Sequence, residues 1–453
     1  MNTATAITAF APLPQPAGHD LLVFLVQVGL LLGLALVLGR VAARFGLPAV
    51  VGELLTGVLV GPSLLGHVTP GLWHWLFPSA GAQANMLNAI AQLGMLLLVG
   101  VSGMHVDLRG MRRRGATAVR VSAGGLLVPL ALGLALGYVL PAALLAPTGT
   151  RSVFVLFLGV AMSVSAIPVI AKTLLDMKLL HRDVGQLTLA AGAVDDAVGW
   201  CLLSVVTAMA AGGVHADQLA LTVVEIVGFV LAMAFVGRPV ARLLFRLAGR
   251  SPEAGPSTAT ALLLIVAGAT ATKALGLEPA FGAFAAGVLL STAGVRAEVD
   301  RARLAPLRTV VLWVAAPIFL ATAGLRMDLT VLADGTVLLW AVVVLVAAVV
   351  GKFAGAYLGA TRSGLSARER FALGAGMNAR GVVEVVVAMV GLQLGVLTTT
   401  TYTIVVLVAI ATSLMSPPLL RRAMSGVDHT AEERLRELDH ARWSAAPEPA
   451  RTE

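Results

Sequence analysis

The residue types best suited to chemistry in this chain are two adjacent carboxylates, Asp195 and Asp196, in the stretch AAGAVDDAVGW. They lie inside the apolar run 185–211, which carries no other charge. As a helix, that run is long enough to cross a bilayer, and at 1.5 Å per residue the aspartates fall roughly 15 Å along it. An ionised group at mid-membrane is costly, and such residues usually line a path for ions or protons.

Two poorly hydrated carboxylates this close together cannot both ionise easily, so one of them is expected to take up a proton. When deprotonated, the same oxygens are hard ligands for a small cation. The sequence therefore predicts a site at Asp196 and Asp195 where a monovalent cation and a proton compete. The alternative is a structural ion pair with a basic residue on another span.

Three more charges lie in apolar runs. Lys352, in AVVGKFAGAYLGA, can supply the counter-charge to one aspartate, or it can extend its long stem to the inner headgroups. Arg380 and Glu384 are four residues apart, a spacing that places them on one helix face. We expect them to form a neutral pair that pins a helix, with direct contact between Glu384 and the cation as the alternative.

Two of the predicted spans look broken. In one, Ser163 and Ser165 precede Pro168, which lacks a backbone donor, and the hydroxyls can satisfy backbone groups left open. In the other, three glycines and Asn378 cluster within 374–381. The two spans run in opposite directions in the predicted topology, so the pair indicates an inverted-repeat transporter with its site between the breaks. Ordinary kinks are the alternative.

Composition excludes several classes of protein. Of the 453 residues 58% are hydrophobic and 12% charged, which indicates a polytopic membrane protein that is all-helical. The net charge of +8 fits arginine-rich cytoplasmic loops better than nucleic-acid binding. The single cysteine, Cys201, cannot form an internal disulfide. No catalytic triad or phosphate loop is present, so we expect neither an enzyme nor a cofactor.

Hydropathy divides the chain into an external tail (1–19), a transmembrane exchanger domain (20–420) and a short cytoplasmic tail (421–453). The domain is expected to contain about thirteen spans: 20–39, 49–65, 86–104, 117–141, 152–172, 185–211, 218–237, 257–276, 279–294, 308–325, 335–360, 370–393 and 402–420. Arginines and lysines concentrate in alternate connections, which predicts an N-terminus outside and a C-terminus in the cytoplasm. The expected location is the plasma membrane.

At this point several motifs resemble those of the monovalent cation:proton antiporters. The stretch LPAVVGELLTGVLVGPSLLG resembles the second span of the branch that holds bacterial sodium/proton exchangers, potassium-efflux systems and plant cation/proton exchangers. AMSVSAIPVIAKTLLD, AGAVDDAVGW, APIFLATAGLRMDL and GMNARGVVEVVVA match that branch in the same order. The resemblance runs from about Leu21 to Leu420.

The resemblance implies a core domain with two crossing, partly unwound helices, a dimerisation domain, a homodimer and an elevator-like motion. It places Asp196 at the family's cation/proton carboxylate, Asp195 beside it and Lys352 opposite. Ser163 and Ser165 fall at one crossing, and Arg380 and Glu384 at the other. The glutathione-gated potassium-efflux members carry a nucleotide-binding C-terminal domain that the tail 421–453 does not resemble, so that kind of gating is not expected.

The sequence therefore predicts a secondary transporter that exchanges sodium or potassium for protons by alternating access within a lipid bilayer. It does not decide between the two cations. One alternative is an accessory membrane protein of the same fold that exports or senses another solute. A passive channel is disfavoured, because broken helices around a carboxylate suit an occluded site better than an open pore.

Overall fold

The computed structural model describes residues 18–78, 81–106, 115–147, 150–212, 216–292 and 303–428, together with 430 and 433–434. The predicted external tail lies almost wholly outside these residues, since the first helix begins at Gly18. The last long helix continues to Met424, a few residues into the segment predicted as the C-terminal tail.

Helices make up nearly all of the regular structure in the described residues, where the one β contact is an isolated bridge between Leu145 and Leu397. Helices suit a lipid-embedded chain because they satisfy backbone groups internally. The first part of the chain contains α1 (Gly18–Arg44), α2 (Ala49–Val60), α3 (Leu65–Val68), α4 (Pro70–Leu76), α5 (Ala82–Gly103), α7 (Gly115–Val139), η1 (Ala142–Leu144), α8 (Arg151–Ser163), α9 (Ile167–Asp176) and α10 (Asp183–Gly212). The second part contains α11 (Ala216–Ala232), η2 (Met233–Gly237), α12 (Arg238–Ala248), α13 (Gly255–Ala274), α14 (Pro279–Thr292), α16 (Ala305–Val310), η3 (Val311–Ala315), α17 (Ala316–Gly324), η4 (Leu329–Ala333), α18 (Gly335–Gly359), α19 (Ala367–Met377), α20 (Val382–Gln393) and α21 (Thr399–Met424).

Helix length supports fewer spans than the thirteen expected. Among the described residues, ten helices are long and apolar enough to cross a membrane, or eleven if α19 and α20, bent by 43°, count as one broken span. The difference arises at α8 with α9, and at α14. A break divides α8 from α9, and α14 is short, so neither α8 nor α14 reaches the roughly 20 residues that a straight span needs.

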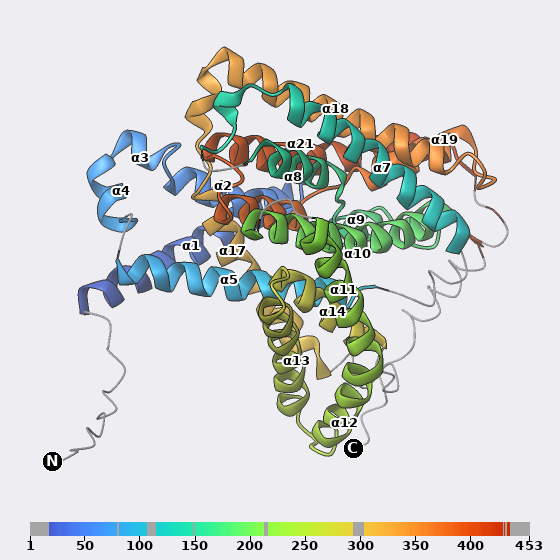
Figure 1. Ribbon diagram of the computed structural model, residues 1–453, viewed down its shortest axis with the longest axis horizontal. Helices are drawn as coiled ribbons and strands as arrows, with labels where there is room; N and C mark the ends of the chain where they lie inside the picture. The colour runs from blue at the N-terminus through green and yellow to red at the C-terminus, as the bar shows by residue number, and fades with distance from the viewer. Residues whose placement is uncertain are drawn as a thin grey trace.

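The long helices pack as two groups (Figure 1). We call α7–α10 and α18–α21 the site bundle, because it contains the aspartate pair. We call α1, α2, α5, α13, α14, α16 and α17 the flanking bundle. The continuous helix α11–α12 follows α10 and leads into α13, so it links the two. In Figure 1, α12 and α13 extend away from the remaining helices.

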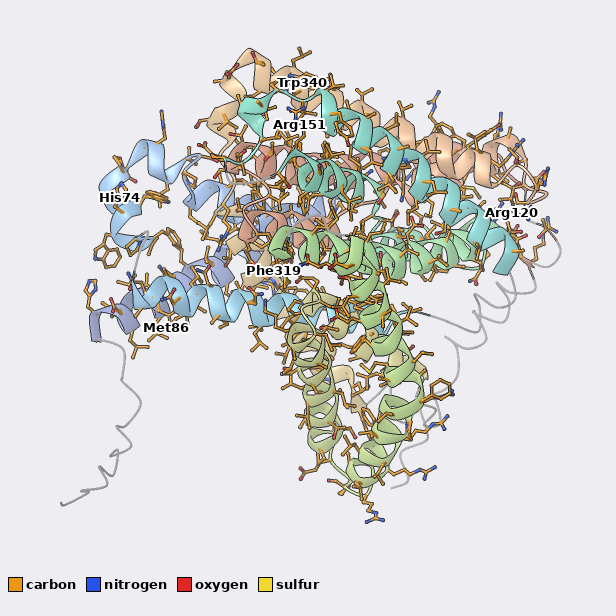
Figure 2. All side chains as sticks on the ribbon, viewed as in Figure 1. His74, Met86, Arg120, Arg151, Phe319 and Trp340 are labelled. Atoms are coloured by element: carbon orange, nitrogen blue, oxygen red, sulfur yellow. The ribbon has the colours of Figure 1, made fainter. Side chains whose placement is uncertain are left out.

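The molecule has two distinguishable ends. At one, which we call the α4 end, Ser63 donates a hydrogen bond to the carbonyl of Met327 (3.0 Å), and Leu145 pairs with Leu397. Arg182, at the start of α10, binds the carbonyl of Val427 beyond α21, so these two helices meet at the opposite end. Figure 2 shows His74 of α4 and Arg120 of α7 at opposite extremes.

Glycines allow the helices of the flanking bundle to approach closely. A Cβ atom on Gly57 of α2 would lie 2.0 Å from the carbonyl oxygen of Ala321 in α17. One on Gly52 would lie 2.2 Å from the carbonyl oxygen of Leu38 in α1. The two glycines of the GELLTG motif therefore serve backbone-to-backbone packing of α2 on both sides.

Candidate functional site

Helix α10 carries the aspartate pair at the centre of the site bundle. Asp195 and Asp196 are both fully buried, and adjacent helical residues point about 100° apart, so they meet different neighbours. Gly192 and Gly199 lie on the face of α10 that approaches the α8–α9 break: a Cβ on Gly192 would contact Ile170 and Ile167, and one on Gly199 would contact Val164. Small residues here let the broken helix reach the carboxylates.

Asp195 has both oxygens satisfied. Its Oδ1 accepts a 2.6 Å hydrogen bond from Ser122 of α7. Its Oδ2 accepts one from Ser165 at 3.0 Å and one from Lys352 Nζ of α18 at 2.7 Å. The Lys352 and Asp195 side chains are both fully buried. Asp195 is therefore a carboxylate with its counter-charge already in place.

Ser122 is a contact that sequence reasoning missed. Its only signal is a hydroxyl in an otherwise apolar span, and hydroxyl residues in membrane helices usually bond to their own backbone. Thr188 and Ser204 of α10 do so, at 2.7 and 3.0 Å.

Asp196 has no such partners. Neither carboxylate oxygen accepts a hydrogen bond from a described residue, although the side chain is fully buried. It interacts with the backbone amide of Ile167, the first residue of α9. A helix N-terminus favours negative charge, so the position suits an anionic carboxylate that keeps its ligand-binding capacity free.

The first helix break spans Val164–Ala166, just before Pro168. Pro168 lies in the first turn of α9, where a missing donor leaves no hydrogen bond unmade. The backbone carbonyls at the end of α8 accept hydrogen bonds from basic side chains, in place of the amides of a following helical turn. Ser163 O accepts a 2.5 Å hydrogen bond from Lys352, and the carbonyls of Ala161 and Met162 accept from Arg380.

The second break separates α19, ending at Met377, from α20, beginning at Val382. It crosses the first break directly: Ala166 donates its amide to the carbonyl of Ala379 (3.3 Å), and Ser165 Oγ, whose single proton is shared between Asp195 and this second acceptor, lies 3.1 Å from Met377 O. The Asn378 side chain is fully buried and makes no hydrogen bond with a described residue. Open backbone and unpaired polar groups thus gather beside the aspartates.

Arg380 and Glu384 form the expected pair, with Arg380 Nη1 3.0 Å from Glu384 Oε1 and both side chains buried. The same guanidinium binds the end of α8. One side chain therefore joins the two crossing helices, and Glu384 balances its charge.

The structure shows which of the predicted site residues contact the aspartate pair and which do not. Lys352 pairs with Asp195 and does not reach the membrane surface, since it is 0% exposed, so the alternative of an extended stem is wrong. Ser165 contacts Asp195 with its side chain. Ser163 contributes only its carbonyl, because its Oγ bonds to Val160 O at 2.9 Å. The alternative of a structural ion pair describes Asp195 and does not describe Asp196.

The described residues contain no group of three or more His, Cys, Asp or Glu side chains arranged for a metal ion. The oxygens gathered at the crossing are those of carboxylates, hydroxyls and backbone carbonyls, which are hard ligands.

Comparison with known proteins identifies the family to which the sequence is similar. Residues 30–424 match the family described as sodium/hydrogen exchanger, transmembrane. The chain is 31% identical over 410 residues to the Na(+)/H(+) antiporter NhaS4 of Synechocystis, covering 89% of this chain and 97% of that protein. It is 28% identical over 419 residues to K(+)/H(+) antiporter 1 of Saccharomyces cerevisiae, covering 90% of this chain and 47% of that longer protein.

Among solved structures, the sodium proton antiporter MjNhaP1 from Methanocaldococcus jannaschii shares the fold. The two chains superpose with a TM-score of 0.67 at 18% sequence identity, covering 90% of this chain and 98% of the other.

Proposed function

The chain belongs to the sodium/hydrogen exchanger family of monovalent cation/proton antiporters, and we propose that Asp196 is the group at which cation and proton compete. The observation that carries this proposal is the contrast within the pair. Asp195 accepts hydrogen bonds from Ser122, Ser165 and Lys352, whereas Asp196 accepts none from a described side chain and interacts with the backbone amide of Ile167.

The charges of the site support exchange of one ligand for another. Five buried ionisable side chains surround the crossing: the acids Asp195, Asp196 and Glu384, and the bases Lys352 and Arg380. Fully ionised, three acids and two bases leave one negative charge. A buried net charge is unfavourable, so the empty site is stabilised when Asp196 takes up either one proton or one monovalent cation. Cation entry on one side and proton entry on the other then gives coupled exchange.

Asp195 and Lys352 act on Asp196 indirectly in this proposal. Lys352 neutralises Asp195. It also places a positive charge near Asp196, which favours the carboxylate form of Asp196 that a cation can bind. The ion pair also fastens α18 to α10 and, through Ser163 O, to the end of α8. A cation that binds at Asp196 would therefore affect the packing of α8, α10 and α18. The charge moved per cycle depends on whether Lys352 keeps its proton.

The wider architecture belongs to the same proposal. The two bundles would correspond to a mobile core domain and a dimerisation domain that move relative to each other by alternating access. Counting the broken span α8–α9 and short α14 as crossings gives thirteen in all, with the N-terminus outside and the C-terminus in the cytoplasm of a plasma-membrane homodimer. The alternation of basic connections supports this orientation.

The test is a vesicle assay on the purified protein in proteoliposomes. An internal pH dye reports proton movement when sodium, potassium or choline is added separately. We expect a response to sodium, potassium or both and none to choline. Asp196→Asn should abolish the response, whereas Asp217→Asn, the same change at an exposed aspartate, should leave it intact.

The outcomes separate the alternatives. Full exchange by folded Asp196→Asn protein would remove the assignment of Asp196. A lack of response to every alkali cation by the natural protein would favour an accessory role with another solute. Cation flux without proton movement would favour a channel.

A further inference from the structure

The helices of the two bundles make fewer contacts with each other than with helices of their own bundle. Each bundle is held together by extensive helix contacts, such as α7 with α18 and α5 with α14. Apart from the linking helix, the main helix pairs that cross the boundary in the described residues are α10 with α14 and α17 with α20. Two bundles with few mutual contacts can shift relative to each other if the hydrogen bonds between them are few and weak.

Four hydrogen bonds cross this boundary between residues that the structure describes. They are Gln393 Nε2 to Gln92 Oε1 (3.3 Å), Tyr402 OH to Ala323 O (2.8 Å), the Asp328 amide to Thr403 Oγ1 (3.0 Å) and Thr207 Oγ1 to Glu278 Oε2 (3.3 Å). We call them the boundary bonds.

All four boundary bonds lie on the same side of the aspartate pair. Gln393 is the last residue of α20, and Tyr402 and Thr403 lie near the start of α21, so these residues mark the α4 ends of both helices. Thr207 lies in the last turns of α10, which begins at the opposite end. The structure is therefore tied across the boundary at the α4 end.

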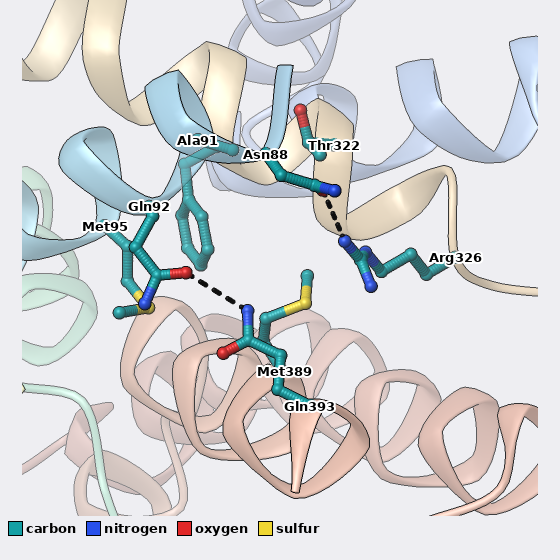
Figure 3. A pocket seen from close by; sticks show the side chains of 9 residues that line it. Asn88, Ala91, Gln92, Met95, Thr322, Arg326, Met389 and Gln393 are labelled. Carbon is teal, nitrogen blue, oxygen red and sulfur yellow. Dashed lines mark hydrogen bonds between the residues drawn. The ribbon is translucent and has the colours of Figure 1, made fainter. Parts of the chain in front are cut away.

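A small pocket adjoins the first of these bonds (Figure 3). The flanking bundle supplies most of its lining, and the site bundle supplies Met389 and Gln393 of α20. Its polar groups are Asn88, Gln92, Thr322, Arg326 and Gln393. The pocket is polar and lies on the boundary, near the end of α20, the helix that begins at the crossing. An aqueous entrance to the site would open at this position.

We propose that the Gln92–Gln393 hydrogen bond is the contact that closes this entrance, and that it must break each time the site opens toward the α4 end. The proposal rests on the exchange function given above. A bond between two neutral amides suits this role, because it is weak enough to break and re-form in every cycle. Figure 3 shows both side chains reaching into the pocket from opposite bundles.

The same pocket contains a natural control. Arg326 Nη2 donates a 2.6 Å hydrogen bond to Asn88 Oδ1, but both residues belong to the flanking bundle and its connection to η4. Linking Asn88 to Arg326 fixes nothing across the boundary, whereas linking Gln92 to Gln393 fixes one bundle to the other.

The experiment is reversible cross-linking in a protein that lacks its single cysteine, through Cys201→Ala. The double variants Q92C/Q393C and N88C/R326C are joined with a short bifunctional methanethiosulfonate reagent and assayed in proteoliposomes. We expect the cross-linked Q92C/Q393C protein to lose at least nine-tenths of its exchange and to recover it on reduction. The N88C/R326C protein should keep its exchange at equal cross-linking yield.

Unchanged exchange by fully cross-linked Q92C/Q393C protein would overturn the inference. Loss in both pairs would also count against it, since closure would then not depend on the boundary. If the natural protein carries out no exchange in the same assay, the failure lies with the proposed function.

A second measurement needs no cross-link. In the Cys201→Ala background, Thr322→Cys places a thiol at the buried wall of the pocket. Adding Gln393→Leu removes the bond while keeping a side chain of similar size. We expect an impermeant thiol reagent to label Cys at 322 several-fold faster once the bond is gone. An unchanged labelling rate would contradict the proposal.

Discussion

Lys352 Nζ lies 2.7 Å from Asp195 Oδ2, with both side chains fully buried, and this contact divides two neighbouring aspartates into different chemical roles. Asp195 becomes part of an internal ion pair that joins α18 to α10. Asp196, one residue later, accepts no hydrogen bond from a described side chain and faces the N-terminus of α9. A pair that looks symmetrical in sequence is thus a fixed charge beside an exchangeable one.

This division predicts a specific pattern of stability. Lys352→Met should leave Asp195 buried without its counter-charge and destabilise the protein by about 3–5 kcal/mol, the usual effect of breaking a buried pair from one side. The double variant D195N/K352M, which removes both charges, should recover most of that loss. Thermal unfolding of the purified variants measures both effects. Equal stability of the single and double variants would show that the pair is not a stabilising contact in the folded protein.

Ser122 offers a second prediction, on the opposite oxygen of Asp195. Ser122→Ala removes a 2.6 Å hydrogen bond to a charged group, a contact worth about 1.5–3 kcal/mol. We expect a lower melting temperature and a shifted pH profile of exchange, since Asp195 lies next to the exchanging carboxylate. Ser204→Ala is the matched control, because that hydroxyl bonds only to Trp200 O in its own helix. Similar pH profiles for the two variants would argue against a role for Ser122 at the site.

The family, the all-helical class and the two helix breaks could be predicted from sequence because each depends on local pattern. The resemblance to the cation:proton antiporters is confirmed by the family match over 30–424. Lys352, Arg380 and Glu384 were identified because charge in an apolar run has few acceptable explanations.

The partners of Asp195 could not be predicted in the same way. Ser122 and Lys352 lie 73 and 157 residues from it in the chain, so their meeting depends on how α7 and α18 pack against α10. Likewise, the position of Pro168 inside the first turn of α9 depends on where the preceding backbone leaves the helix, which hydropathy does not show. Helix length does not confirm the predicted count of thirteen spans, because α8, α9 and α14 are shorter than an uninterrupted span.

Close packing of α2 on α17 gives a third prediction. In Gly57→Ala the new methyl group would lie 2.0 Å from Ala321 O, a main-chain atom that cannot move aside without shifting the helix. Overpacking of this kind costs about 1–3 kcal/mol. Gly29→Ala in α1 is the control, since nothing lies within 4 Å of a Cβ there. Thermal unfolding should place the first variant well below the natural protein and the second at or above it.

The last prediction concerns the start of the C-terminal tail, where Glu433 contacts the beginning of α10. Its Oε1 accepts a 2.7 Å hydrogen bond from the Asp183 amide, and its Oε2 lies 3.1 Å from Arg182 Nε, with both side chains nearly inaccessible. Arg182 in turn binds the carbonyls of Val427 and Asp428. These contacts fasten the tail to the helix that carries the aspartate pair.

Burial opposes ionisation of Glu433, but the amides of Asp183 and Thr430 and the guanidinium of Arg182 outweigh it, so its pKa lies below the ordinary value. A carboxyl whose pKa is lowered by folding stabilises the folded form at all pH values above its ordinary pKa, and that contribution is lost as the pH falls through the lowered one. Attachment of the tail should therefore be complete at neutral pH and weaken only in acid. Glu433→Gln, which cannot ionise, should release the tail already at neutral pH, making Arg182 open to trypsin under limited digestion followed by mass spectrometry. Asp428→Asn should change nothing, because that residue contributes only its carbonyl. If Arg182 in the Glu433→Gln protein resists cleavage as it does in the natural protein at neutral pH, the ion pair is not what holds the tail.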